Sequence, residues 1–177
     1  MRRGFDSPIP LPCPSEALYE GGESDRNYKM TSRAKKLDPQ PHYDFFVSGR
    51  WRNRDNILDL TKKIREKEYH VYCFLEASHS VHRVKDDPEE SMKNFEKLDW
   101  RNDPYVKEVF RNDMAGEKNS DVFVMLQPAG KSCHIEAGVA YGMGKKCILI
   151  GEQKEAESLY LIFNEIYPSV DEFLKTI

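Results

Sequence analysis

The run GKSCHIEAGVAYGMG, from Gly130 to Gly144, places one carboxylate, Glu136, among small residues. Apolar segments predicted as strands precede and follow it, at Asp121–Gln127 and Lys146–Gly151. Open α/β sheets bind ligands at the carboxyl ends of their strands, and a helix N-terminus stabilises an anion. The run therefore predicts a helix whose first turn holds Glu136 ionised and directed at a pocket, as a nucleophile requires. A solvated surface carboxylate is the alternative.

Glycines and a short polar loop surround this carboxylate. Gly138 and Gly142 each make a helix interior about 1 kcal/mol less stable than Ala would. They therefore predict the close approach of a strand, a partner helix or a ligand. The loop Gly130-Lys131-Ser132 has backbone N–H groups that could face an oxyanion or a phosphate.

Asp113 is a candidate second carboxylate. It lies near the end of a predicted helix, eight residues before Asp121, which opens the next strand. The same sheet edge could bring Asp113 toward Glu136. Retaining glycosidases use two carboxyl groups about 5 Å apart, one of which attacks the anomeric carbon. A surface position for Asp113 is the alternative that the sequence leaves open.

Three arginines, Arg50, Arg52 and Arg54, alternate after the first predicted strand. Guanidinium groups match phosphate oxygens in geometry, so these residues predict a phosphate-binding corner, with solvated charge as the alternative.

Two other chemistries lack their signatures. His134-Ile135-Glu136 has the H-x-E spacing of zinc deaminases, but no P-C-x-x-C follows it. No G-x-G-x-x-G is present, which disfavours a dinucleotide site. We therefore expect no metal and no organic cofactor.

Strand-like and helix-like segments alternate along the chain. This alternation predicts an α/β fold, an open parallel sheet of four or five strands in flavodoxin/Rossmann-like order with helices on both faces. The predicted strands are 43–47, 70–75, 121–127 and 146–151. The predicted helices are 55–67, one beginning at Pro88 with Asp87 as its cap, 104–116, one capped by Ser132 and ended by Gly144, 155–166 and 169–176.

Composition limits the class of protein. The first 42 of the 177 residues hold six of the ten prolines, which predicts a disordered arm over 1–42 and one domain over 43–177. The net charge of −3 gives no basic excess for a nucleic-acid polymer. No apolar run approaches the length of a membrane span, and no secretory signal is apparent. Four cysteines without metal or redox spacing indicate a reducing compartment, cytoplasmic or nuclear.

Three segments, taken in order, resemble the nucleoside 2-deoxyribosyltransferase family and its hydrolytic relatives, the 2-deoxynucleoside 5-phosphate N-hydrolases and cytidine-monophosphate hydrolases. The first is FFVSGRWR, residues 45–52, similar to the family's opening strand with its glycine and arginine. The second is Asp113 followed by SDVFV at 120–124, and the third is EAGVA at 136–140 followed by GKK at 144–146. Together they span about 43–150.

The resemblance implies roles. Glu136 would be the nucleophile that displaces the base from the sugar, and Asp113 would orient the sugar and assist proton transfer. The remaining residues expected to contact substrate are Gly49, Arg50, Arg52, Gly130, Ser132 and Gly138. The implied ligand is a small nucleoside or nucleotide, and the implied assembly is a homodimer or a larger homo-oligomer.

The chain also departs from the family. His134 and Ile135 stand where the hydrolases carry small residues, and the serine-rich phosphate loop is reduced to residues 130–132. Two alternatives therefore stay open: a non-catalytic sensor or adaptor that binds a nucleotide, and an NAD-type glycohydrolase.

Overall fold

The computed structural model describes residues 41–77, 80 and 85–177. All but the last two residues of the predicted arm, 1–42, lie outside this range. The first strand begins at Tyr43, the residue at which the folded domain was predicted to start.

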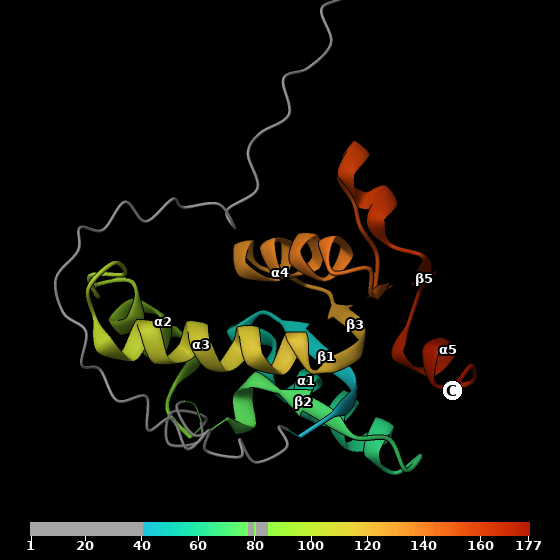
Figure 1. Ribbon diagram of the computed structural model, residues 1–177, viewed down its shortest axis with the longest axis horizontal. Helices are drawn as coiled ribbons and strands as arrows, with labels where there is room; N and C mark the ends of the chain where they lie inside the picture. The colour runs from blue at the N-terminus through green and yellow to red at the C-terminus, as the bar shows by residue number, and fades with distance from the viewer. Residues whose placement is uncertain (1–40, 78–79, 81–84) are drawn as a thin grey trace, which may run out of the picture. The chain divides into compact units, whose positions relative to one another are not determined.

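Five parallel strands form one sheet in the order β2-β1-β3-β4-β5 (Figure 1). Val124 in the central strand pairs with Val47 on one side and with Ile148 on the other. This is the flavodoxin-like order that the sequence predicts. The strands are β1 (Tyr43–Gly49), β2 (Val71–Cys73), β3 (Ser120–Leu126), β4 (Lys146–Ile150) and β5 (Glu165–Tyr167).

Five α-helices and three short 3-10 helices connect the strands. Asp87 and Asp103 accept hydrogen bonds from backbone N–H groups in the first turns of two of these helices, each of which has proline at its first position. The helices are α1 (Arg54–Arg65), α2 (Pro88–Phe95), α3 (Pro104–Lys118), α4 (Lys131–Gly142), α5 (Val170–Leu174), η1 (Trp51–Asn53), η2 (Phe74–Glu76) and η3 (Ser158–Ile162).

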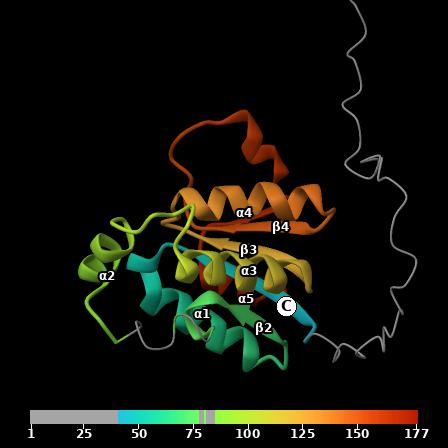
Figure 2. The same cartoon turned by 60° about the vertical axis from the view of Figure 1, so that its left-hand side comes forward.

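Helices cover both faces of the sheet, as predicted (Figures 1 and 2). On one face, α1 and α5 pack through Ile57, Leu60 and Phe173 against alternate residues of the strands. On the other face, α4 packs through Cys133 and Ala137 on the opposite set. Helix α3 lies beside α4 and contacts β1 and β3. Strands buried on both faces explain the nearly continuous apolar runs in the sequence.

Three predicted features are wrong. The second strand ends at Cys73 rather than at residue 75, because η2 begins at Phe74. The spacing of Val106, Val109 and Phe110 predicts that they share one inward face of their helix, but Phe110 is exposed. The predicted helix over 155–166 is replaced by η3 and the edge strand β5.

Local hydrogen bonds account for that replacement. The side chain of Asn164 accepts a hydrogen bond from the backbone N–H of Cys147 at 2.8 Å, and the N–H of Gly151 donates to the carbonyl of Tyr167 at 2.8 Å. The segment around Ile166 thus extends the sheet instead of continuing a helix. Among the described residues, no helix is long and apolar enough to cross a membrane.

Candidate active site

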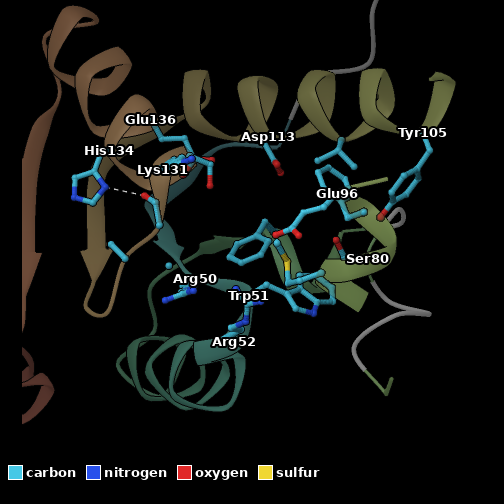
Figure 3. A pocket seen from close by; sticks show the side chains of 18 residues that line it. Arg50, Trp51, Arg52, Ser80, Glu96, Tyr105, Asp113, Lys131, His134 and Glu136 are labelled. Carbon is cyan, nitrogen blue, oxygen red and sulfur yellow. Dashed lines mark hydrogen bonds between the residues drawn. The ribbon is translucent and has the colours of Figure 1, made fainter. Parts of the chain in front are cut away.

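A cavity of about 680 Å³ opens at the carboxyl ends of β1 and β3 (Figure 3). The loop after β1, helices α2 and α3, and the N-terminal half of α4 surround it. Every predicted site residue except Gly138 lines this cavity. They are Gly49, Arg50, Arg52, Asp113, Gly130, Ser132 and Glu136.

Glu136 projects into the cavity from the second turn of α4. The hydroxyl of Ser48, next to last in β1, donates a hydrogen bond to Glu136 Oε2 at 2.5 Å. Burial raises the pKa of Glu136, and the Ser48 hydrogen bond lowers it. The predicted position in the first turn is wrong by one turn. Because the effect of a helix N-terminus falls off within the first turn, the Ser48 hydroxyl is the specific group that favours the ionised form.

Asp113 reaches the same cavity from α3. The hydroxyl of Tyr72 donates a hydrogen bond to Asp113 Oδ1 at 2.9 Å. Burial, and secondarily the charge of Glu136, raise the pKa of Asp113 to about 7, against the lowering effect of Tyr72. Burial and the charge of Asp113 also raise the pKa of Tyr72, so its phenol remains a donor. Asp113 can therefore hold a proton near neutral pH.

The two carboxyl groups share one cavity although 23 residues of chain separate them. Figure 3 shows their side chains projecting into it from neighbouring helices. Buried carboxyl groups in one low-dielectric site favour a state in which one is ionised and the other protonated. This arrangement suits a nucleophile beside a proton donor.

Helix α4 begins two residues earlier than predicted. Gly130 is the N-cap, in an extended conformation with φ −113° and ψ −177°, so the prediction that Ser132 caps the helix is wrong. The N–H of Gly130 donates to Cys133 Sγ at 3.4 Å, and its carbonyl accepts a hydrogen bond from His134 Nδ1 at 2.7 Å. His134, where the chain departs from the hydrolases, thus holds the turn that leads into the helix.

The three arginines separate in the structure. The guanidinium of Arg52 binds the carboxylate of Glu89, with Nη2 and Oε2 2.8 Å apart, and Arg54 donates to the backbone carbonyl of Asp86. Arg50 is exposed and passes beside Gly130, its Cγ being 3.9 Å from the position of a Cβ there. Arg50 and Lys131 thus place two positive charges at the N-terminal end of α4.

Gly138 lies outside the cavity, on the exposed side of α4. A Cβ built on Gly138 or on Gly142 meets no heavy atom within 4 Å. In the described part of the chain, neither the strand nor the helix that we expected approaches them closely.

Two kinds of residue in the cavity were not predicted as site residues from the sequence. Ser48 and Tyr72 contact the carboxylates directly, and the signal for Ser48 was a polar residue at the carboxyl end of an apolar strand. The second kind is an aromatic and apolar wall of Trp51, Phe74, Met92, Phe95, Tyr105 and Val109. Within the described ranges, no group of three His, Cys, Asp or Glu side chains could hold a metal ion.

Comparisons with known proteins place the fold. No model of a protein family and no curated protein matches the sequence. One similar structure is the CMP N-glycosidase BcmB of Clostridium botulinum, 24% identical over 75% of this chain and 96% of that chain, with a TM-score of 0.40. Another is the 2-deoxyribosyltransferase of the psychrotolerant Bacillus psychrosaccharolyticus, 13% identical over 73% of this chain and 89% of that chain, with a TM-score of 0.50.

The similarity to the 2-deoxyribosyltransferase and the strand order both agree with the fold that the sequence resemblance implies. At this level of identity it concerns the fold. The chain has the fold of the nucleoside 2-deoxyribosyltransferase-like proteins.

Proposed function

We propose that this protein cleaves or transfers the N-glycosidic bond of a nucleoside or a nucleoside 5-phosphate, with Glu136 as the nucleophile. The observation that carries the proposal is the pair of partly buried carboxyl groups, Glu136 and Asp113, in one cavity. Each has its own hydroxyl donor, Ser48 or Tyr72. The 2-deoxyribosyltransferase of similar fold supports the same reaction class.

The first step forms an ester on Glu136. Its ionised oxygen attacks the anomeric carbon of the sugar, the C–N bond to the base breaks, and the base leaves with the bonding electron pair. Asp113, protonated near neutral pH, donates a proton to the departing base. The second step reverses these roles, since ionised Asp113 accepts a proton from the incoming water or base, which attacks the same carbon and releases Glu136.

The two ends of the cavity suit the two ends of a nucleotide. The aromatic wall offers apolar surface to a flat base. In it, the rings of Phe95 and Tyr105 pack edge to face with their centroids 6.2 Å apart. Arg50, Lys131 and the N–H groups at the start of α4 offer positive charge to a phosphate. A nucleoside 5-phosphate is therefore the form of substrate that these contacts favour.

Release of free base tests the proposal. Wild type, Glu136→Gln and Glu76→Gln are incubated with a panel of nucleosides, their 5-monophosphates and NAD, and the products are separated by chromatography. Glu76 is the matched control because it is an exposed glutamate paired with Arg65 away from the cavity. We expect base release by wild type and Glu76→Gln, and a loss of about a thousandfold or more in Glu136→Gln.

Other outcomes are equally informative. Turnover by Glu136→Gln within tenfold of wild type would remove Glu136 as nucleophile. Nucleotide binding measured by calorimetry, with no base release anywhere in the panel, would identify a sensor rather than an enzyme. Nicotinamide release from NAD alone would identify a glycohydrolase of that substrate.

A further inference from the structure

Glu117 is a buried carboxyl group that the mechanism above does not use. Its side chain is inaccessible to solvent, with a relative exposure of 0%. Neither of its oxygens makes a hydrogen bond of good geometry among the described residues, and the backbone of Ala140 on α4 favours its ionised form less strongly than Lys145 does. It lies one turn after Asp113 on α3, and residues four apart on a helix lie on the same face. Glu117 therefore lies next to the candidate catalytic carboxyl groups and away from solvent.

Four ionisable groups act on Glu117 or respond to its charge. Burial and the negative charges of Glu136 and Asp113 oppose its ionisation, whereas the Lys145 ammonium favours it. Together these effects raise the pKa of Glu117 to about 7. The ammonium of Lys145 also donates to the backbone carbonyls of Lys118 and Ser120. On β4, the thiol of Cys147 has its pKa raised by burial and by Glu117.

We propose, building on the function proposed above, that Glu117 is a positioning residue and the third member of a carboxyl cluster with Glu136 and Asp113. It holds a proton while Glu136 is ionised, so that the negative charge of the cluster stays on the nucleophile. The three groups repel one another when they are ionised. With Glu117 present, the cluster therefore loses its last protons at a higher pH than Glu136 and Asp113 would alone.

A structural role alone does not account for a glutamic acid here. A leucine would fill a similar volume without burying two carboxyl oxygens, and such exchanges for apolar residues are often neutral or stabilising. What the carboxyl group adds at this position is a charge that can appear and disappear beside Glu136 and Asp113.

The pH profile of kcat/KM for base release is the first test, with Glu117→Gln and Glu117→Leu beside wild type. Both variants remove one like charge, so the remaining pair loses its last proton at a lower pH. We expect the alkaline limb to move down by about half a unit to one unit, with a smaller change in the acid limb. A structural role would lower stability without moving this limb, so an unmoved limb in both variants would overturn the proposal.

Unfolding midpoints between pH 5 and pH 8 give a second test that needs no activity. A carboxyl group whose pKa rises from 4.5 to about 7 on folding stabilises the native state most at low pH. That contribution is lost as the pH rises toward 7. Glu117→Gln has no carboxyl group at this position and so does not lose stability in this way. The unfolding midpoint of Glu117→Gln should therefore rise relative to that of wild type as the pH increases. Glu76→Gln, the exposed control, should run parallel to wild type.

The two tests separate the two proposals. If wild type releases no base from any compound in the panel, the proposed function fails, yet the stability curves still decide whether Glu117 is protonated in the native protein. If wild type is active and Glu117→Gln runs parallel to it in stability, the proposal for Glu117 fails and the proposed function stands.

Discussion

At the scale of single residues, one hydroxyl opposes the effect of burial on the candidate nucleophile. Ser48 is the side chain that lowers the pKa of Glu136, against the burial that raises it. A hydrogen bond to a charged group stabilises it by about 1.5–3 kcal/mol, and one pKa unit corresponds to about 1.4 kcal/mol. Ser48→Ala should therefore raise the pKa of Glu136 and move the acid limb of kcat/KM to higher pH by about one unit.

The matched control is Ser120→Ala. Ser120 is also a buried serine, and its hydroxyl donates to the backbone carbonyl of Gly116 at 2.7 Å rather than to Glu136. It should lower thermal stability and leave the acid limb in place. Equal shifts in the two variants would mean that the limb does not report Glu136.

Glu136 and Asp113, which share one cavity, could be predicted from the sequence because both lie in short patterns that resemble those of a family. The sequence was insufficient for Ser48, Tyr72 and Glu117, which carry no pattern of their own. Their roles arise where two or three elements meet, from burial and from which hydroxyl lies nearest a carboxylate. Only the packed structure sets those quantities.

At the scale of elements, the N-terminus of α4 is the candidate phosphate site. The exposed side chains of Arg50 and Lys131 lie there, while Arg52 is already bound by Glu89. Lys131→Gln should raise KM for a nucleoside 5-phosphate by about tenfold, since a charge-assisted hydrogen bond contributes about 1.5–3 kcal/mol. KM for the matching nucleoside should change little.

Steady-state kinetics on that pair of substrates is the measurement. Lys154→Gln, an exposed lysine outside the cavity, serves as the control and should behave as wild type on both substrates. An equal rise in KM for nucleoside and nucleotide in Lys131→Gln would argue against a phosphate contact.

A close approach of β2 to α3 positions the second carboxyl group. A Cβ at Gly116 would stand 2.5 Å from ring atoms of Tyr72, whose hydroxyl donates to Asp113. The same ring stacks on Phe46 with centroids 5.1 Å apart, which limits its movement. Gly116→Ala should therefore displace the ring, lower stability by about 1–3 kcal/mol and reduce kcat.

A double-mutant cycle checks the cause. In a Tyr72→Leu background the ring is absent, so adding Gly116→Ala should cost little further stability, as measured by denaturant unfolding. Additive losses in the cycle would show that the clash involves another neighbour.

Elements with local signals were predicted well, and those defined by distant partners were not. Asp87 with Pro88 and Asp103 with Pro104 mark helix starts that need only neighbouring residues. The stretch 155–166 has apolar residues that fit a helix, yet Asn164 pairs with Cys147 from β4 and makes the chain extend. Nothing within 155–166 itself carries that information.

At the scale of the whole described domain, the order of strands brings the site together. The parallel strands end at one edge, so Ser48 near the end of β1 meets the start of α4 after β3, although Gly130 lies 82 positions after Ser48 in the sequence. The alternation of strands and helices in the sequence predicted this sheet edge. The aromatic and apolar wall was not predictable as a unit, because its members come from four separate segments, η1, η2, α2 and α3.

The last prediction concerns assembly as a homodimer, which the family resemblance implies and the surface supports. Ile135 on α4 and Leu161 on η3 are 68% and 89% exposed, and the two elements adjoin through the His134 and Tyr160 rings, 5.7 Å apart. Gly138, with open space around it, would let a second helix approach closely. Large exposed apolar groups of this kind mark protein interfaces.

Sedimentation velocity measures the assembly directly. Wild type should sediment as a dimer, whereas Ile135→Lys with Leu161→Asp should sediment as a monomer, because each change buries a charge in the contact. Trp100→Asp removes a similarly exposed apolar side chain, 69% exposed, from the loop between α2 and α3 and should leave the dimer intact. Dissociation by Trp100→Asp, with the dimer intact in the Ile135→Lys, Leu161→Asp variant, would show that the interface lies at the loop between α2 and α3. A monomeric wild type would contradict the prediction of a dimer.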